Sequence, residues 1–160
     1  MRAWRITRRL ERTDAFTGKL AAEFGGRWNP PDIPAVYLAS SLALAVLEVL
    51  AHADPAFEPQ DLLAIPVDIP EDMTRQQVAA AGLPPDWQQH ESEYCRRVGI
   101  AWHEAGKHAF LEVPSAVIPL ERNLVANPRH ADFSRVDLSH YGYPLRFDPR
   151  LIGIVDVAAT

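Results

Sequence analysis

The sequence predicts an α+β fold with a mixed or antiparallel sheet core and a few flanking helices, and three observations support this class. Short segments of alternating or β-branched residues recur along the chain. Only two or three segments have helical periodicity. The two kinds of segment do not alternate strictly, as they would in a doubly wound fold. The chain of 160 residues shows no repeats and no linker, so we expect one domain over residues 1–160.

Periodicity places the individual elements. The expected helices are residues 41–52 and 91–105, with a short one at 72–81, and residues 19–24 in an ambiguous stretch are read as one or two helical turns. The expected strands are residues 3–7, 35–39, 62–69, 109–113, 116–120, 133–138 and 144–147, with a further candidate at 151–157.

Local signals set the ends of these elements. Gly25-Gly26 ends the first helix, and Ser40 or Ser41 supplies the N-cap of the second. Gly82 ends the third helix. Pro66 indicates an edge position or a bulge in its strand, because proline cannot donate to the ladder. Residues 123–130 are rich in turn formers and are predicted as a turn-rich stretch.

Composition limits the functional classes. The net charge of −5 and pI of about 5.6 argue against sequence-independent nucleic-acid binding, which needs basic patches. Cys95 is the only cysteine, so no internal disulfide can form and a reducing cytosol is the natural compartment. The N-terminus lacks the apolar region of a secretion signal, and the longest apolar stretch, residues 33–51, is interrupted by polar residues and proline. We expect a cytoplasmic protein without membrane association.

The helix predicted over residues 41–52 carries the strongest functional signal. It is apolar on all sides except at Glu48. A helix without a polar face is usually buried, and an unpaired buried carboxylate costs several kcal/mol. Glu48 should therefore border a cleft or have a cationic partner. The nearest cation in an unusual setting is Arg27, in a turn after Gly25-Gly26, and a purely structural salt bridge is an open alternative.

Other common chemistries lack support in the sequence. Glu48 and His52 share a helix face, but no His-Glu-x-x-His pattern exists and we predict no metal site. Ser115 is not in a Gly-x-Ser-x-Gly elbow, and Cys95 reads as a core thiol. Neither a Walker sequence nor a Gly-x-Gly-x-x-Gly loop is present.

A combination of three residues points to nucleotide chemistry. Arg27 can bind a phosphate, Tyr37 can face a flat base, and Glu48 can contact a ribose. Cleavage of an N-glycosidic bond passes through an oxocarbenium-like transition state that a nearby carboxylate stabilises. The hypothesis is that the three side chains converge at one cleft.

These residues also resemble the RES domain family, toxins of bacterial toxin–antitoxin pairs. The family is named for an arginine, a glutamate and a serine. Here they would be Arg27 in Gly-Gly-Arg-Trp-Asn-Pro, Glu48 in Ala-Leu-Ala-Val-Leu-Glu-Val-Leu-Ala-His, and Ser115 in Val-Pro-Ser. Further matching segments are Trp4-Arg5, Val36-Tyr37-Leu38-Ala39 and Asn123-Leu124-Val125-Ala126-Asn127-Pro128-Arg129-His130, so the likeness runs to about Phe147. Ala131 departs from the proline expected there.

The resemblance implies an ADP-ribosyltransferase-like fold, with NAD⁺ as substrate rather than a bound cofactor and inorganic phosphate as a potential co-substrate. It gives Arg27 and, less directly, Arg5 the role of phosphate contacts. Tyr37 would stack on nicotinamide or orient the ribose. Glu48 would bind the ribose and stabilise the cation, and Ser115 would contact substrate or position Glu48.

The resemblance also implies partners and leaves alternatives open. The expected partner is an Xre-type antitoxin that occludes the cleft, with a homodimer inside a larger assembly. The leading function is NAD⁺ degradation by phosphorolysis or hydrolysis. The alternatives are a protein mono-ADP-ribosyltransferase toxin and a non-catalytic antitoxin-binding module, and a nuclease is disfavoured by the acidic balance.

Overall fold

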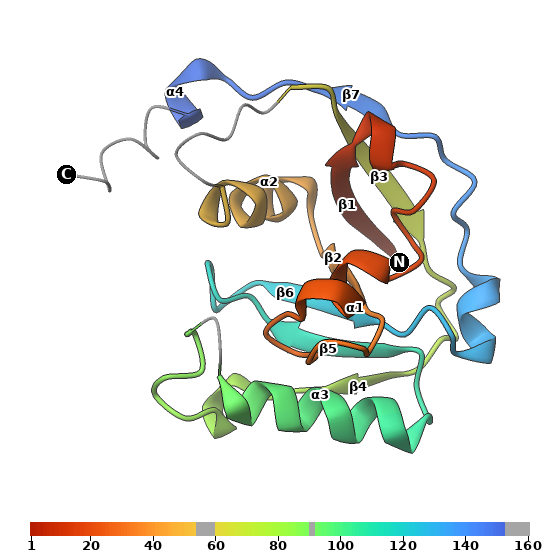
Figure 1. Cartoon of the computed structure of the whole chain (residues 1–160), viewed down its shortest axis with the longest axis vertical. Coiled ribbons are helices and arrows are strands. Elements are labelled where there is room, and N and C mark those ends of the chain that lie inside the picture. Colours follow the sequence, from red (N-terminus) through yellow and green to blue (C-terminus); the bar gives the residue numbers. More distant parts are fainter. Residues whose placement is uncertain (54–59, 90–91, 153–160) are drawn as a thin grey trace.

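The computed structural model describes residues 1–53, 60–89 and 92–152 and has an α+β architecture (Figure 1). Its strands are β1 (Arg2–Arg8), β2 (Val36–Ala39), β3 (Leu62–Asp68), β4 (Arg75–Gln77), β5 (Phe110–Pro114), β6 (Arg122–Ala126) and β7 (Tyr143–Leu145). Its α-helices are α1 (Lys19–Phe24), α2 (Leu42–Ala51), α3 (Glu93–Ala105) and α4 (Pro149–Ile152), with 3₁₀ turns at Arg9–Glu11, Ala80–Gly82 and Ala131–Arg135.

The strands form one seven-stranded mixed sheet in the order β4-β5-β6-β2-β1-β3-β7. Only β4 and β5 pair in parallel, and the other pairings are antiparallel. The predicted α+β class with a mixed sheet is therefore confirmed.

The centre of the sheet is split. β1 pairs with β3 at seven positions, but its register with β2 contains the single pair Trp4 and Ala39. Figure 1 shows β1 and β3 turning away from β6 and β5 on either side of β2. Residues 36–38 of β2 therefore have no register partner on β1.

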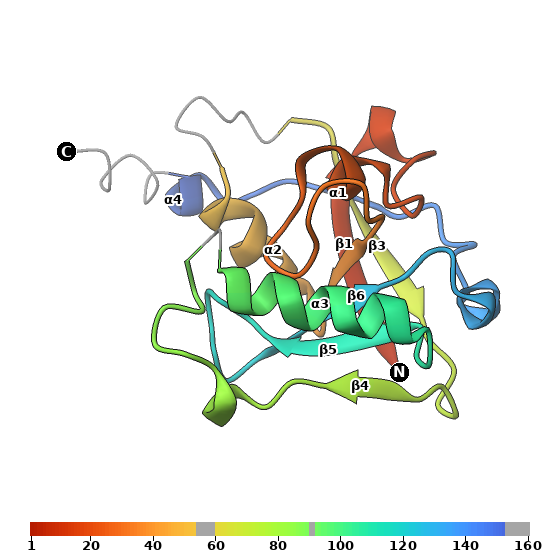
Figure 2. The same cartoon turned by 60° about the horizontal axis from the view of Figure 1, so that its bottom comes forward.

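Helices α2 and α3 cover neighbouring parts of the sheet. α3 packs through Cys95 and Trp102 on Leu111 of β5 and Val125 of β6 (Figure 2). α2 packs through Leu44 and Ala45 on a smaller cluster built from β1 and β2. Ser41 caps α2 by accepting a hydrogen bond from the Leu44 N–H at 3.1 Å, as one of the two predicted caps. Among the described residues, no helix is long and apolar enough to cross a bilayer.

The prediction of a helix over residues 72–81 is wrong. This segment forms β4 and then the short 3₁₀ turn at Ala80–Gly82. β4 adds a parallel strand to β5, the Val78 N–H donates to the Glu112 carbonyl at 2.8 Å, and Arg75 pairs with the Glu112 carboxylate at 3.4 Å. Pairing with an existing sheet edge outweighs the local helical propensity of this short segment, which contains good helix formers such as alanine and glutamine.

The prediction of a strand at residues 116–120, after β5, is also wrong. Residues 116–120 form a turn, closed by the Glu121 N–H donating to the Ile118 carbonyl, and the strand is β6. β6, Arg122–Ala126, includes the first four residues of the stretch predicted as turns, residues 123–130. Its pairing with both β2 and β5 fixes it as a strand.

Three smaller predictions concern the rest of the chain. The strand predicted at 133–138 is wrong, because Ala131–Arg135 form a 3₁₀ turn capped by the His130 side chain. The candidate strand at 151–157 is wrong for its first two residues, which end α4, and residues 153–157 lie outside the described part. Pro66 does occupy a local edge, because β7 pairs only with residues 62–64 of β3.

Gly99 lets α3 approach the turn that carries Arg27. A Cβ at Gly99 would lie 1.6 Å from the carbonyl oxygen of Trp28, and Trp28 is itself buried beside α3. No side chain fits between this helix and the turn backbone. The position of the Arg27 turn therefore depends on the absence of a side chain at residue 99.

We predict that Gly99→Ala destabilises the protein, although alanine normally favours a helix by about 1 kcal/mol over glycine. Overpacking should lower the free energy of unfolding by roughly 1–3 kcal/mol. The control is Gly82→Ala, where no atom lies within 4 Å of the added Cβ. Equal denaturation midpoints for both variants would contradict the close packing of α3 on the turn.

Candidate active site

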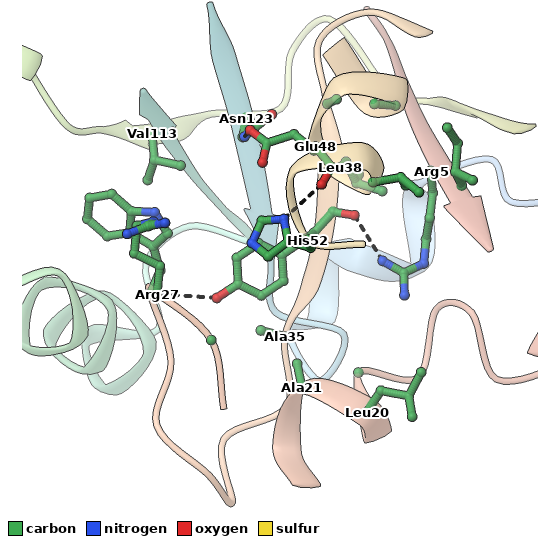
Figure 3. A pocket seen from close by; sticks show the side chains of 18 of the residues that line it. Arg5, Leu20, Ala21, Arg27, Ala35, Leu38, Glu48, His52, Val113 and Asn123 are labelled. Atoms are coloured by element: carbon green, nitrogen blue, oxygen red, sulfur yellow. Dashed lines mark hydrogen bonds between the residues drawn. The ribbon is translucent and has the colours of Figure 1, made fainter. Parts of the chain in front are cut away.

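A pocket of about 530 Å³ opens at the split in the sheet. That size falls within the range of small-molecule sites. Its walls come from β1, β2, α1 with the following turn, α2, and the ends of β5 and β6. Figure 3 shows Glu48 on one side of this pocket and Ala21 and Leu20 of α1 on the other, with Arg27 and Arg5 flanking it.

Glu48 extends from α2 toward β6 at the pocket wall. Its Oε1 accepts a hydrogen bond from the Ser115 hydroxyl at 2.7 Å and another from Asn123 Nδ2 at 2.5 Å. The other oxygen, Oε2, has no hydrogen-bond partner among the described residues. Glu48 also lines the pocket. One oxygen of the carboxylate is thus anchored and the other is available to a ligand.

Ser115 uses its whole hydrogen-bonding capacity within the protein. It is fully buried directly after β5. Its hydroxyl donates to Glu48 and accepts from the backbone N–H groups of Val117 at 3.1 Å and Ile118 at 3.0 Å. A serine hydroxyl has one proton and two lone pairs. Ser115 therefore orients Glu48, and its hydroxyl is fully buried in a residue that does not line the pocket, which argues against a nucleophilic role.

We predict that Ser115→Ala lowers activity without abolishing it and also lowers the free energy of unfolding by about 1–3 kcal/mol, because two N–H groups lose their acceptor. Ser134→Ala, at an exposed serine with a local hydrogen bond, is the control. Activity and thermal unfolding are measured on both. Loss of activity as complete as that of a Glu48 variant would indicate a covalent role for Ser115.

Arg27 is held at the pocket by backbone carbonyls. It lies in a tight turn in which the Gly26 N–H donates to the Asn29 carbonyl at 2.7 Å. Its Nη1 donates to the carbonyls of Trp87, at 3.2 Å, and Gln89. Burial lowers the pKa of Arg27, against the opposing influence of Glu48 and other nearby groups. No ion pair joins Arg27 and Glu48 in the described residues, so the structural salt bridge considered from the sequence is absent.

Tyr37 presents its ring to the pocket and not its hydroxyl. The hydroxyl donates to Asn29 Oδ1 at 2.7 Å and accepts from the Trp28 N–H at 3.1 Å. Burial raises the pKa of Tyr37 well above its usual range. A Cβ at Gly26 would lie 2.5 Å from this hydroxyl, which explains the glycine there. Tyr37 is thus locked to the Arg27 turn, and its ring is the part that lines the pocket.

Arg5 lies across the pocket from Arg27 (Figure 3). Its Nη1 donates to the Tyr37 carbonyl at 3.0 Å, a group left free by the split between β1 and β2. Within the described ranges, its Nε is buried without a hydrogen-bond partner. Burial lowers the pKa of Arg5 to about 10. No carboxylate pairs with it among the described residues, so an anionic ligand would compensate its charge.

The structure brings all five sequence-predicted site residues to one cavity or its wall. Arg5, Arg27, Tyr37 and Glu48 line the pocket, and Ser115 bonds directly to Glu48. Sequence reasoning assigned no role to Asn123, the second donor to Glu48. The role of Asn123 was hard to predict from the sequence, because this residue lies in the stretch predicted as turns. Its position opposite Ala39 and Val113 appears only from strand pairing.

One further cluster, outside the pocket, has metal-like spacing. Asp68, Asp137 and His140 offer ligand atoms within 4.8 Å of one another. Arg2 donates to both carboxylate oxygens of Asp68 at 2.8 Å, and His140 lies 3.0 Å from one of them. These bonds hold the pKa of Asp68 well below its usual range. An ion-pair network accounts for the cluster, and the absence of a metal site stays a prediction.

Comparison with known proteins identifies the family. A sequence model described as "RES domain" matches residues 2–148. "Toxin Res" of Photorhabdus laumondii is 37% identical over 133 residues, covering 82% of this chain and 85% of that protein. The "Prs ADP-ribosylating toxin" of Sphingobium sp. is 34% identical over 157 residues, covering 93% of this chain and 95% of that protein.

A third relative supplies a solved fold. "NAD(+) phosphorylase MbcT" of Mycobacterium tuberculosis is 50% identical over 44 residues, which cover 27% of this chain and 24% of that protein. A crystal structure of the MbcT-MbcA toxin-antitoxin complex matches with a TM-score of 0.68 at 24% identity, covering 98% of this chain and 88% of that one. The chain belongs to the RES domain family of toxins.

Proposed function

We propose that this toxin degrades NAD⁺ by cleaving the bond between nicotinamide and ribose. The observation that carries the proposal is the hydrogen bonding of the Glu48 carboxylate. One of its oxygens is fixed by Ser115 and Asn123, and the other has no partner among the described residues at the wall of a ligand-sized pocket. The named relatives that act on NAD⁺ or transfer ADP-ribose support the same chemistry.

The proposal gives each residue a role that its contacts support. Oε2 of Glu48 binds a hydroxyl of the nicotinamide ribose and stabilises the positive charge that develops as nicotinamide leaves. The exposed face of Tyr37 holds the nicotinamide ring or the ribose. Arg27 and Arg5, both without a carboxylate partner in the described part of the chain, bind the pyrophosphate and the attacking phosphate. No bound cofactor or metal is required by this scheme.

We predict that the free protein consumes NAD⁺ and that Glu48→Gln lowers the turnover by at least about a hundredfold, because an amide carries no charge to stabilise the cation. Arg27→Ala should mainly raise KM for NAD⁺. Glu104→Gln and Arg129→Ala, at exposed positions outside the pocket, are matched controls. Nicotinamide release measures the rates. Unchanged turnover in Glu48→Gln would refute the site.

We further predict that inorganic phosphate is the attacking group, because the pocket contains two guanidinium groups on separate walls. Attack of a phosphate oxygen on ribose C1 releases nicotinamide and gives ADP-ribose 1-phosphate. Reactions with and without phosphate are compared, and products are identified by mass spectrometry. Equal rates with ADP-ribose as the product would establish hydrolysis instead.

Transfer of ADP-ribose to a protein is the second candidate function. The specific support is the Sphingobium relative, which is named for that activity and matches 93% of this chain. The same fixed carboxylate would serve both reactions, with a protein side chain replacing phosphate. Labelled NAD⁺ incubated with cell lysate separates the two, since transfer gives a discrete labelled protein band.

An antitoxin is the proposed partner. The mouth of the pocket carries exposed apolar side chains on α1, with Phe24 71% and Leu20 45% exposed. Such a rim suits the insertion of a partner segment. The complex of the relative MbcT with MbcA supports this assignment. An Xre-type DNA-binding region in the antitoxin and a homodimer within the assembly stay predictions. A purely antitoxin-binding module is disfavoured by the intact hydrogen bonds around Glu48.

A further inference from the structure

We propose that Asn123 is a positioning residue for Glu48, and that Asn123 and Ser115 together make the two carboxylate oxygens unequal. Ser115 and Asn123 both donate to Oε1, and Oε2 is left for substrate. The inference rests on the proposed function of Glu48. It adds a residue that the pattern of arginine, glutamate and serine does not contain.

The backbone of Asn123 is held on both sides. β6 lies between β2 and β5, and Asn123 pairs with Ala39 of one strand and Val113 of the other. Glu48 by contrast projects from α2, a helix that packs on the sheet through small clusters. The hydrogen bond from Nδ2 therefore ties a side chain of the helix to a rigid point in the sheet. It complements the bond from Ser115, which lies after β5.

The other end of the Asn123 amide argues against a purely stabilising role. Its Oδ1 is buried without a hydrogen-bond partner in the part of the chain that the structure describes. Leaving a buried acceptor unpaired costs about 1–3 kcal/mol, which offsets a charge-assisted bond of about 1.5–3 kcal/mol. Asn123 thus contributes little net stability. The orientation that lets Nδ2 donate to the Glu48 carboxylate leaves Oδ1 of the same amide unpaired among the described residues.

This balance separates positioning from structure. Asn123→Ala removes the donor to Glu48 and the unpaired acceptor together, so stability should change little. The carboxylate, however, loses one of its two anchors. Asn123→Asp has nearly the same shape but places a second negative group beside Oε1, which repels Glu48. Activity should therefore fall in both variants, and more in the aspartate variant.

The matched control is Asn127, a buried asparagine just after the same strand. Its Oδ1 accepts from the Arg129 N–H at 2.9 Å, and the residue does not line the pocket. Asn127→Ala should lower the thermal midpoint and keep kcat near the wild-type value. Asn123→Ala should instead lower kcat and keep the thermal midpoint near the wild-type value.

The experiment combines kinetics, thermal unfolding and crystal structures of these variants. For Asn123→Ala we expect a kcat about 10- to 100-fold lower, because one charge-assisted hydrogen bond to Glu48 is lost. KM for NAD⁺ should be nearly unchanged. The crystal structure should show the Glu48 carboxylate displaced or disordered in an otherwise unchanged fold. A wild-type kcat, or a fall in thermal midpoint like that of Asn127→Ala, would overturn the inference.

Failure of the proposed function gives a different result. If wild-type protein and Glu48→Gln treat NAD⁺ alike, the proposed reaction is wrong, and the position of the Glu48 carboxylate in Asn123→Ala alone decides the positioning role. An unmoved carboxylate there would overturn it whatever the reaction.

Discussion

The hydrogen bonds from Ser115 and Asn123 to one oxygen of Glu48 are the interaction on which the site depends. A carboxylate on an apolar helix is costly to desolvate, and these two donors compensate it without neutralising its charge. They also connect α2 to the ends of β5 and β6. The same contacts thus hold the helix against the sheet and fix the group proposed for catalysis.

The split between β1 and β2 creates the space around that carboxylate. Because the two strands share one residue pair, the Tyr37 carbonyl is free to bind Arg5, and a pocket opens where a continuous sheet would be packed. On the other side, Gly99 admits the backbone of the turn bearing Arg27 against α3. Both guanidinium groups are held by backbone carbonyls, so their charges are left for a ligand.

The sequence predicted the parts of this site that have a local signature. The odd placement of Glu48 in an apolar helix, the glycine turn before Arg27 and the strand at Tyr37 are all visible in short windows. Asn123 and β4 were missed because their conformation comes from pairing with distant strands, against weak local preferences. For Glu48 the residues alone left two alternatives, a cleft or a cationic partner such as Arg27. Glu48 borders the pocket, and neutral donors from β6 and the end of β5 bind its carboxylate. Of these donors, only Ser115 was suggested beforehand, by the family resemblance.

A crystal structure with carba-NAD⁺, an analogue that resists cleavage of the nicotinamide–ribose bond, tests the central claim most directly. The account predicts a hydroxyl of the nicotinamide ribose within hydrogen-bonding distance of Glu48 Oε2, with Oε1 still bound to Ser115 and Asn123. The pyrophosphate should contact Arg27 or Arg5. An analogue bound away from this pocket, or inside it with Glu48 Oε2 uncontacted, would contradict the account.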